Sequence, residues 1–192
     1  TAGTSTVNFS GTANQVIGGS FSTNFNNLTI SNSSAIVSLS TNENIVSNLS
    51  ISAGTLDLGA FTANRITSGG VLTVANNAVL KIGGTNTFPV NYSTVNLVVA
   101  STVEYAGANQ NVSNQVYGNL KLSSSAGAVV KTFPASALTI VGNLLSEQGA
   151  GTSVTSNTGA SMEINGNVSI GASTILNAGA FSHNIYGNWL NE

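Results

Sequence analysis

The feature that most constrains this chain is a short motif that returns about every 23 residues, a period typical of repeat architectures. A Gly-Asn pair among apolar residues occurs in VYGNLKL, IVGNLL, INGNVSI and IYGNWL, with looser copies in FNNLTI, VSNLSI and TVNLVV. The marker asparagines of these copies are Asn27, Asn48, Asn96, Asn119, Asn143, Asn167 and Asn188. Val71 takes the marker place in a degenerate copy, so the successive spacings are 21, 23, 25, 23, 24, 24 and 21 residues. A fixed period of roughly 20–50 residues is the sign of a solenoid.

Each period carries the same plan of short strands. The marker is followed by an alternating segment such as NLTI or NVSI, and a small turn then leads to a second alternating segment. These second segments are TLDLG (55–59), VLKIG (79–83), TVEYAG (102–107), VVKTF (129–133) and STIL (173–176). A third short strand, such as MEIN, ends before the next marker. Alternation and β-branched residues indicate strands, and no segment has helical spacing. We therefore predict an all-β, right-handed parallel β-helix (a β-solenoid) of about eight coils with three strands each.

The Gly-Asn pair predicts a repeated corner between the third strand and the first. We expect Gly118, Gly142, Gly166 and Gly187 to occupy this corner, since glycine tolerates the positive φ that corners can require. The following asparagines would then stack as an inward-facing ladder, because an amide both donates and accepts hydrogen bonds. The alternative, that the amides face outward and bind a ligand, is disfavoured.

A longer period overlies the short one. STVNFSGTANQ (5–15) returns as STVEYAGANQ (101–110), and GAFTANRI (59–66) is echoed by GAFSHNIY (179–186). The chain is therefore interpreted as one solenoid, 1–192, of two divergent copies of a unit of roughly 96 residues (about 1–96 and 97–192). Neither end shows a polar cap, which predicts either a slice of a longer rod or a subunit that stacks end to end.

The composition excludes several classes of function. Only 5% of residues are charged, and four Lys and Arg with a net charge of −2 give a nucleic acid nothing to bind. There is no cysteine, which excludes disulfides and thiolate metal sites. No apolar run is long enough to cross a bilayer, and the first residues do not resemble a signal peptide.

Four charges are predicted to form a ladder. Asp57, Lys81, Glu104 and Lys131 occupy equivalent places in four successive second strands, with alternating signs. Opposite charges on adjacent strands stabilise by roughly 0.2–1 kcal/mol per pair. The alternative is a polysaccharide-cleaving carboxylate pair, which needs carboxylates grouped without their lysines.

Other candidate sites are weak. His183 stands alone and is expected on the surface, no G-x-S-x-G motif occurs, and no catalytic, cofactor-binding or metal-ligating residue is predicted. Phe88, Phe133 and Trp189 could stack on sugars, but their phases in the coil differ, and Trp189 is expected to fill the core near the end of the chain. Ice binding is disfavoured because the threonines do not recur at one phase.

The segments TVEYAGANQNVSNQVYGNLKLS, ALTIVGNLL and AFSHNIYGNWLNE resemble repeats of long secreted surface proteins of Bacteroidota. The resemblance covers nearly the whole chain, except that residues 71–95 lack the Gly-Asn marker. It implies export by the type IX route and a role as a stalk, adhesin or surface matrix component.

The sequence thus predicts a non-enzymatic, extracellular or cell-surface structural rod without cofactors. Its expected partners are further copies or repeats of itself, with a cell-surface polysaccharide as the second candidate and with no nucleic acid and no membrane insertion. The alternative is a polysaccharide-binding β-helix module, or less plausibly a polysaccharide-cleaving or ice-binding one.

Overall fold

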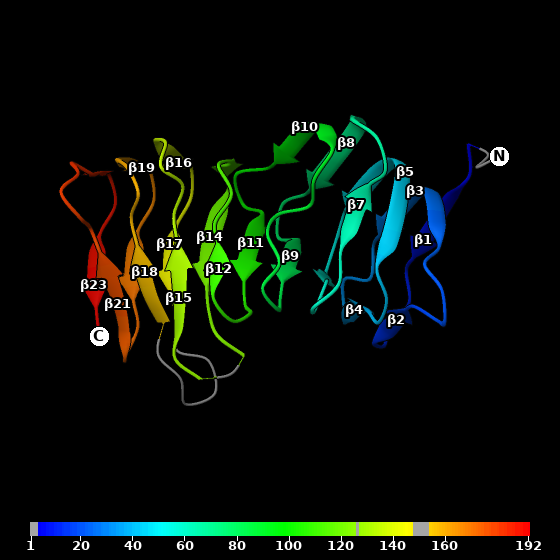
Figure 1. Cartoon of the computed structure of the whole chain (residues 1–192), viewed down its shortest axis with the longest axis horizontal. Coiled ribbons are helices and arrows are strands. Elements are labelled where there is room, and N and C mark those ends of the chain that lie inside the picture. Colours follow the sequence, from blue (N-terminus) through cyan, green and yellow to red (C-terminus); the bar gives the residue numbers. More distant parts are fainter. Residues whose placement is uncertain (1–3, 126, 148–153) are drawn as a thin grey trace.

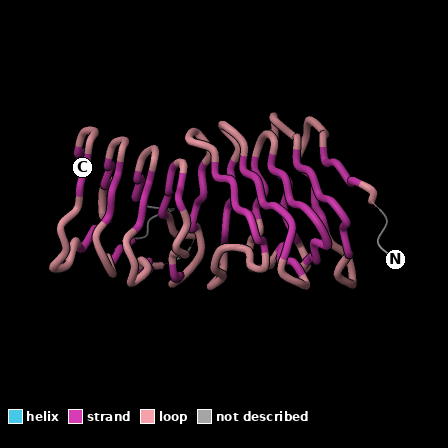
Figure 2. The backbone as a smooth tube through the Cα atoms, turned by 90° about the horizontal axis from the view of Figure 1, so that it is seen from above, coloured by secondary structure: helices cyan, strands magenta, loops and turns pink. Residues whose placement is uncertain are grey.

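The computed structural model describes residues 4–125, 127–147 and 154–192, which form an elongated stack of strands (Figure 1). The described residues contain no helix, and every pair of neighbouring strands is parallel. The strands stack into a parallel β-solenoid of about eight turns, and Figure 2 shows the successive turns side by side along the axis. The predicted fold class is confirmed.

The strands form four sheets that run along the rod. Sheet A contains β1 (Thr6–Phe9), β3 (Asn24–Ile30), β5 (Glu43–Ile51), β7 (Ala63–Arg65), β8 (Gly69–Val74) and β10 (Tyr92–Leu97). Sheet B contains β2 (Gln15–Ile17), β4 (Ile36–Leu39), β6 (Thr55–Asp57), β9 (Val79–Ile82), β11 (Thr102–Tyr105), β14 (Asn119–Leu122), β17 (Leu144–Ser146), β20 (Val168–Ile170) and β23 (Trp189–Asn191). Sheet C contains β12 (Gln110–Asn111), β15 (Val129–Thr132), β18 (Val154–Asn157) and β21 (Thr174–Asn177). Sheet D contains β13 (Val116–Tyr117), β16 (Leu138–Ile140), β19 (Met162–Ile164) and β22 (Asn184–Ile185).

Sheet B is the only one of the four that runs through both halves of the described chain. Sheet A covers the first half and ends at β10, whereas sheets C and D begin at β12 and β13. The prediction of three strands per coil therefore fits the second half, where each turn contributes to sheets B, C and D. In the first half, residues before and after the marker join into single long strands, β3 and β5.

The core consists of columns of aliphatic side chains, one from each turn. On sheet B the register aligns one such column, which is buried over seven successive strands from β4 to β20: Val37, Leu56, Leu80, Val103, Leu120, Leu144 and Val168. Alternate residues of a strand point to opposite faces, so the period-two pattern of the sequence becomes a continuous apolar interior. Burial of these columns is the main force that holds the turns together.

In the middle of the rod the strands that contain the markers move from one sheet to the next, and this change is the shift of phase of the repeat. Thr102 of β11 pairs with Asn119 of β14, and this step along the chain is clearly shorter than the full turn that separates Leu120 from its partner Leu144. As a result, marker strands lie in sheet A in the first half and in sheet B in the second half. Nothing in the evenly spaced markers predicted this shift.

The shift places two similar segments, 96 residues apart in the sequence, on different sheets. Thr6 of TVNF pairs with Asn27 in sheet A, and Thr102 of TVEY pairs with Asn119 in sheet B. In both cases the marker asparagine donates its backbone N–H to the preceding serine carbonyl, Ser5 or Ser101, at 3.1 and 2.7 Å. The paired residues and the hydrogen bond are therefore the same in both segments, but the second segment lies one sheet further around the rod.

Candidate functional site

The marker asparagines form hydrogen bonds between turns, but the bonds differ between the two halves. In the first half, the Asn48 amide donates to Asn27 Oδ1 at 3.0 Å, and Asn48 Oδ1 accepts the Val71 N–H at 2.9 Å. In the second half, each side-chain oxygen accepts the backbone N–H of the next marker. These bonds are Asn119 to Asn143 (2.9 Å), Asn143 to Asn167 (2.8 Å) and Asn167 to Asn188 (2.8 Å).

Two expectations about these asparagines are wrong. Asn96 lies opposite Thr73, and the residue opposite Val71 is Thr94, so Asn96 is two residues out of register and outside the ladder. The side chains also do not face inward, because Asn48, Asn143, Asn167 and Asn188 are exposed. The ladder therefore runs along the outer rim of the corner.

The corner glycines are required for close approach of the backbones and not for positive φ. None of Gly118, Gly142, Gly166 and Gly187 is among the glycines with positive φ. The Gly142 N–H donates to the Gly118 carbonyl at 2.6 Å, and the Gly166 N–H donates to Gly142 at 2.9 Å. A Cβ at Gly142 would lie 2.7 Å from the Gly118 carbonyl oxygen, closer than side chains are found. The glycines thus form a spine where successive turns touch.

The charge ladder exists with a different fourth member. Asp57, Lys81 and Glu104 are aligned in register, and Lys121 of β14 lies opposite Glu104. Lys81 Nζ lies 3.1 Å from Asp57 Oδ2, and Lys121 Nζ lies 3.8 Å from Glu104 and 2.7 Å from Glu147. Burial opposes the charge on Lys121, but the Glu147 and Glu104 carboxylates raise its pKa above the ordinary value.

Lys131 is not part of this ladder. The shift of phase places it in sheet C, fully buried, where Nζ donates to the carbonyls of Gly107 and Ala108 and to Gln110 Oε1 at 2.9, 2.9 and 2.5 Å. Burial lowers the pKa of Lys131 to about 8, although the Glu104 carboxylate opposes this effect. The ammonium group ties β15, the second strand of sheet C, to β12 and to the loop that precedes β12.

Two further polar groups have structural partners. The buried Glu43 carboxylate accepts the Thr23 N–H at 2.6 Å and the Thr41 hydroxyl at 2.5 Å. His183, expected on the surface, is half-buried: Nδ1 accepts the Met162 N–H at 3.0 Å, and Nε2 therefore donates to the Ala178 carbonyl at 2.9 Å. Among the described residues no group of three His, Asp or Glu could hold a metal ion, and no helix there could span a membrane.

The aromatic residues considered for sugar stacking differ in how far their side chains are buried. Phe88 and Phe133 are buried in the core and are excluded. Trp189 lies opposite Val168, in register with the core column, but it is half exposed because β23 is the last strand of sheet B, so it does not fill the core as expected.

The outer face of sheet A carries a regular row of uncharged polar side chains. Asn8, Thr29, Ser50, Thr73 and Asn96 are aligned in register on five successive strands. The expectation that the threonines do not recur at one phase is therefore wrong for Thr29 and Thr73, which lie in one row with Ser50 between them.

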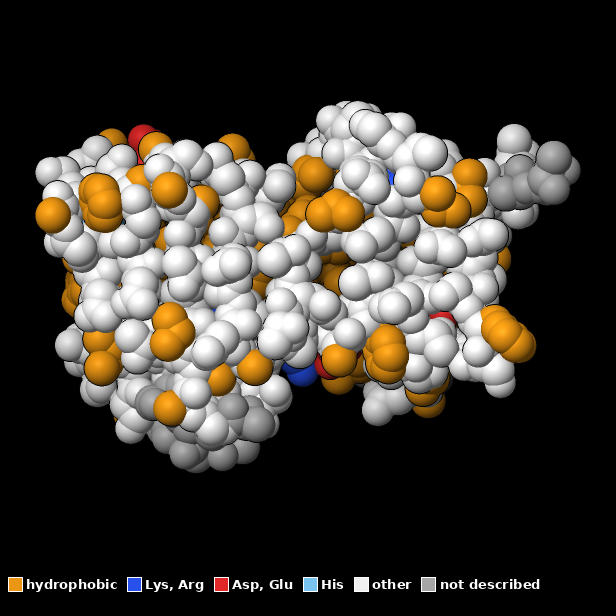
Figure 3. Space-filling model, in the orientation of Figure 1, with side chains coloured by type: hydrophobic (Ala, Val, Ile, Leu, Met, Phe, Trp, Pro, Cys, Tyr) orange, Lys and Arg blue, Asp and Glu red, His pale blue; other side chains and the backbone are white. Residues whose placement is uncertain are grey.

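A groove lies where sheet A ends and sheet D begins. Two adjoining hollows of about 510 and 520 Å³ share Val95 of β10 and Val116 of β13 in their walls. Figure 3 shows this face as two blocks with a hollow between them, in which hydrophobic side chains are visible. The groove is a direct consequence of the shift of phase, because β10 and β13 belong to neighbouring turns but do not pair.

No family model, curated protein or solved structure matches this chain.

Proposed function

We propose that this chain is a non-enzymatic structural rod of an extracellular or cell-surface protein. The observation that carries the proposal is sheet B, whose nine parallel strands run from β2 to β23 and whose buried aliphatic column is unbroken from Val37 of β4 to Val168 of β20. Such a stack resists bending because every turn is hydrogen-bonded to the next. A surface of Ser, Thr, Asn and Gly with few lysines or arginines suits exposure to solvent and proteases outside a cell.

The carboxylates support a structural role over a cleaving one. Asp57 and Glu104 are each aligned with Lys81 between them, and Glu104 also accepts the Ser123 hydroxyl at 2.7 Å. A lysine thus stands between the two carboxylates in the register, whereas acid–base cleavage needs two carboxyl groups close together.

We propose that further coils continue the rod, supplied by the same chain or by another copy. β21, β22 and β23 are the last strands of sheets C, D and B, and they carry exposed apolar side chains, including Ile175, Trp189 and Leu190. Unpaired strand edges with apolar side chains are templates for the addition of strands.

Electron microscopy of the purified protein at neutral pH, without added ligand, tests the rod. Long uniform filaments would support a stacking subunit, and short discrete rods would support a stalk segment. A Trp189→Glu, Leu190→Lys double variant should shorten any filaments and keep the melting temperature. Particles that are not elongated would contradict the proposal.

A second candidate function is that of a polysaccharide-binding module. It is favoured by the row of aligned polar side chains on sheet A, Asn8, Thr29, Ser50, Thr73 and Asn96. Hydroxyl and amide groups at strand spacing, about 4.8 Å apart, could contact a regular uncharged polymer. Co-sedimentation with insoluble polysaccharides tests it, and a Thr29→Lys, Thr73→Lys variant should no longer sediment.

A further inference from the structure

The groove between β10 and β13 contains a free strand edge. The Val98 N–H donates to the Val74 carbonyl at 3.1 Å, so the N–H of Val98 faces β8. In a parallel sheet the N–H and C=O of consecutive residues point to opposite sides. Ser93, Val95 and Leu97 therefore direct their N–H and C=O groups toward the groove, at the spacing of a strand ladder. β10 has no strand partner on this side among the described residues.

The same edge leaves two core columns uncovered. Leu28, Leu49 and Leu72 are fully buried, but Val95, which follows them in register, is only half-buried. The neighbouring column ends in the same way, since Val74 is fully buried and Leu97, opposite it, is half-buried. One more strand with aliphatic residues at alternate positions would complete both columns.

The groove is closed at one end and is lined by uncharged residues. At one end the Gly118 backbone lies directly against the Val98 carbonyl, so no strand fits there. Away from this end the lining includes Tyr92 on one side and Asn114 and Thr139 on the other. No Asp, Glu, Lys, Arg or His lines either hollow. A charged occupant would lose its hydration without gaining a partner.

We propose that this groove binds an extended, uncharged polypeptide segment, which adds as a strand to the free edge of β10. Its main chain would pair with Ser93, Val95 and Leu97, and alternate aliphatic side chains would cover Val95 and Leu97. Strand addition to an exposed edge is a general mode of peptide recognition, in which main-chain bonds give affinity and alternate side chains give specificity. A sugar fits less well, because among the described residues that line the groove only Tyr92 is aromatic, and its hydroxyl already donates to the Ala63 carbonyl at 2.8 Å and cannot donate to a sugar.

The test uses the acetylated and amidated peptide NIVSNLSI, which copies residues 44–51 of sheet A and is uncharged. Nuclear magnetic resonance of the ¹⁵N-labelled protein should show saturable shifts at the Ser93, Val95 and Leu97 amides. These three amides should also exchange with solvent more slowly when the peptide is bound. Two further peptides of the same sequence carry N-methyl groups on alternate residues, one at the odd and one at the even positions. One of the two should bind at least tenfold more weakly than the parent peptide, because its methyl groups replace the N–H groups that pair with β10. No saturable binding, or equal binding of both methylated peptides and the parent, would overturn the proposal.

Variants of the protein locate the site. Val95→Pro removes an N–H that faces the groove and leaves the bonds to β8, as prolines on edge strands do, and it should weaken binding at least tenfold. Val116→Glu places a charge in the groove and should do the same, so the proposal stays testable if the proline variant fails to fold. Val16→Glu is the control, since Val16 is as exposed as Val116 (64% against 61%) and lies on β2. Peptide binding that is lost equally in Val16→Glu, or displacement of the peptide by a neutral oligosaccharide, would overturn strand addition.

Discussion

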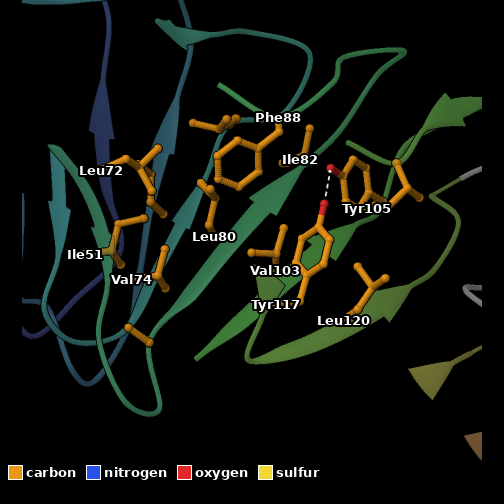
Figure 4. Close-up of a cluster of buried hydrophobic side chains, with 14 of the residues drawn as sticks. Ile51, Leu72, Val74, Leu80, Ile82, Phe88, Val103, Tyr105, Tyr117 and Leu120 are labelled. Carbon is orange, nitrogen blue, oxygen red and sulfur yellow. Dashed lines mark hydrogen bonds between the residues drawn. The ribbon is translucent and has the colours of Figure 1, made fainter. Parts of the chain in front are cut away.

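The hydroxyl oxygens of Tyr105 and Tyr117 lie 3.0 Å apart in the interior of the rod, and both side chains are fully buried (Figure 4). Tyr105 comes from β11 of sheet B and Tyr117 from β13, the first strand of sheet D. Tyr117 donates to the Ser113 carbonyl at 2.7 Å, and Tyr105 accepts the Ser113 N–H at 3.0 Å. The pair therefore fixes the short chain segment that carries out the shift of phase.

Replacing Tyr117 with Phe should destabilise the protein, because Ser113 and Tyr105 would each lose a buried partner. We expect a loss of about 1–3 kcal/mol in the free energy of unfolding, measured with urea. Tyr186→Phe is the control, since Tyr186 is 69% exposed, and it should change little. Equal stability of Tyr117→Phe and the parent protein would show that the hydroxyl pair does not hold the junction.

The lowered pKa of Lys131 leads us to expect that the free energy of unfolding depends on pH above neutrality. Its pKa is lowered to about 8 in the folded protein, against an ordinary value of 10.5. Between these values the unfolded chain binds more protons, so the free energy of unfolding should rise with pH from about 8 toward 10. Above pH 10 the trend should reverse, because burial raises the pKa values of Tyr105 and Tyr117.

Urea unfolding at pH 7.5 and pH 9.5 measures this effect, and a Lys131→Met variant should lack the rise. Titration of the Lys131 side chain by nuclear magnetic resonance gives its pKa directly, even if the methionine variant does not fold. A titration midpoint near 10.5 would contradict the prediction.

The sequence was sufficient to predict the solenoid, because period-two alternation and a fixed repeat both depend on local residues and on the stacking of identical turns. It was not sufficient to predict the sheet on which each turn begins. The spacing from Asn96 to Asn119 is ordinary for this repeat, but the two residues lie on different sheets. Because the sequence does not reveal the change of sheet, it predicts Lys131 as the fourth member of the charge ladder, where the structure has Lys121. The groove was missed for the same reason, since it exists only where the phase shifts.

The outer asparagine ladder should contribute modestly to stability. In Asn143→Ala the Asn167 N–H loses its acceptor, and we expect a loss of about 1 kcal/mol in the free energy of unfolding, at an exposed site. Asn96→Ala is the matched control, because Asn96 lies outside the ladder, and it should change stability by only a few tenths of a kcal/mol. A larger effect of the Asn96 variant would contradict the register of β10.

The charge ladder should respond to salt. Lys81→Glu removes the ion pair with Asp57 and places a carboxylate between Asp57 and Glu104. Because these side chains are partly exposed, we expect a loss of about 1 kcal/mol. High salt should narrow the difference in melting temperature between Lys81→Glu and Lys81→Gln, since it screens repulsion. An unchanged melting temperature at low salt would count against the ladder.

The glycine spine gives the sharpest prediction about stability. A Cβ at Gly142 would meet two neighbours in the adjacent turn, the Gly118 carbonyl and the Asn119 side chain, and the backbone there cannot move away without breaking the Gly142–Gly118 bond. Gly142→Ala should therefore cost about 1–3 kcal/mol, as overpacking does. Gly171 also lies between strands with negative φ, but its nearest neighbour, the Ser146 carbonyl oxygen, would be 3.1 Å away, so Gly171→Ala should cost clearly less. Chemical unfolding of the two variants side by side decides the matter. If both lost the same stability, the loss would reflect a general preference for glycine at turns, and close approach of the backbones would not explain the motif.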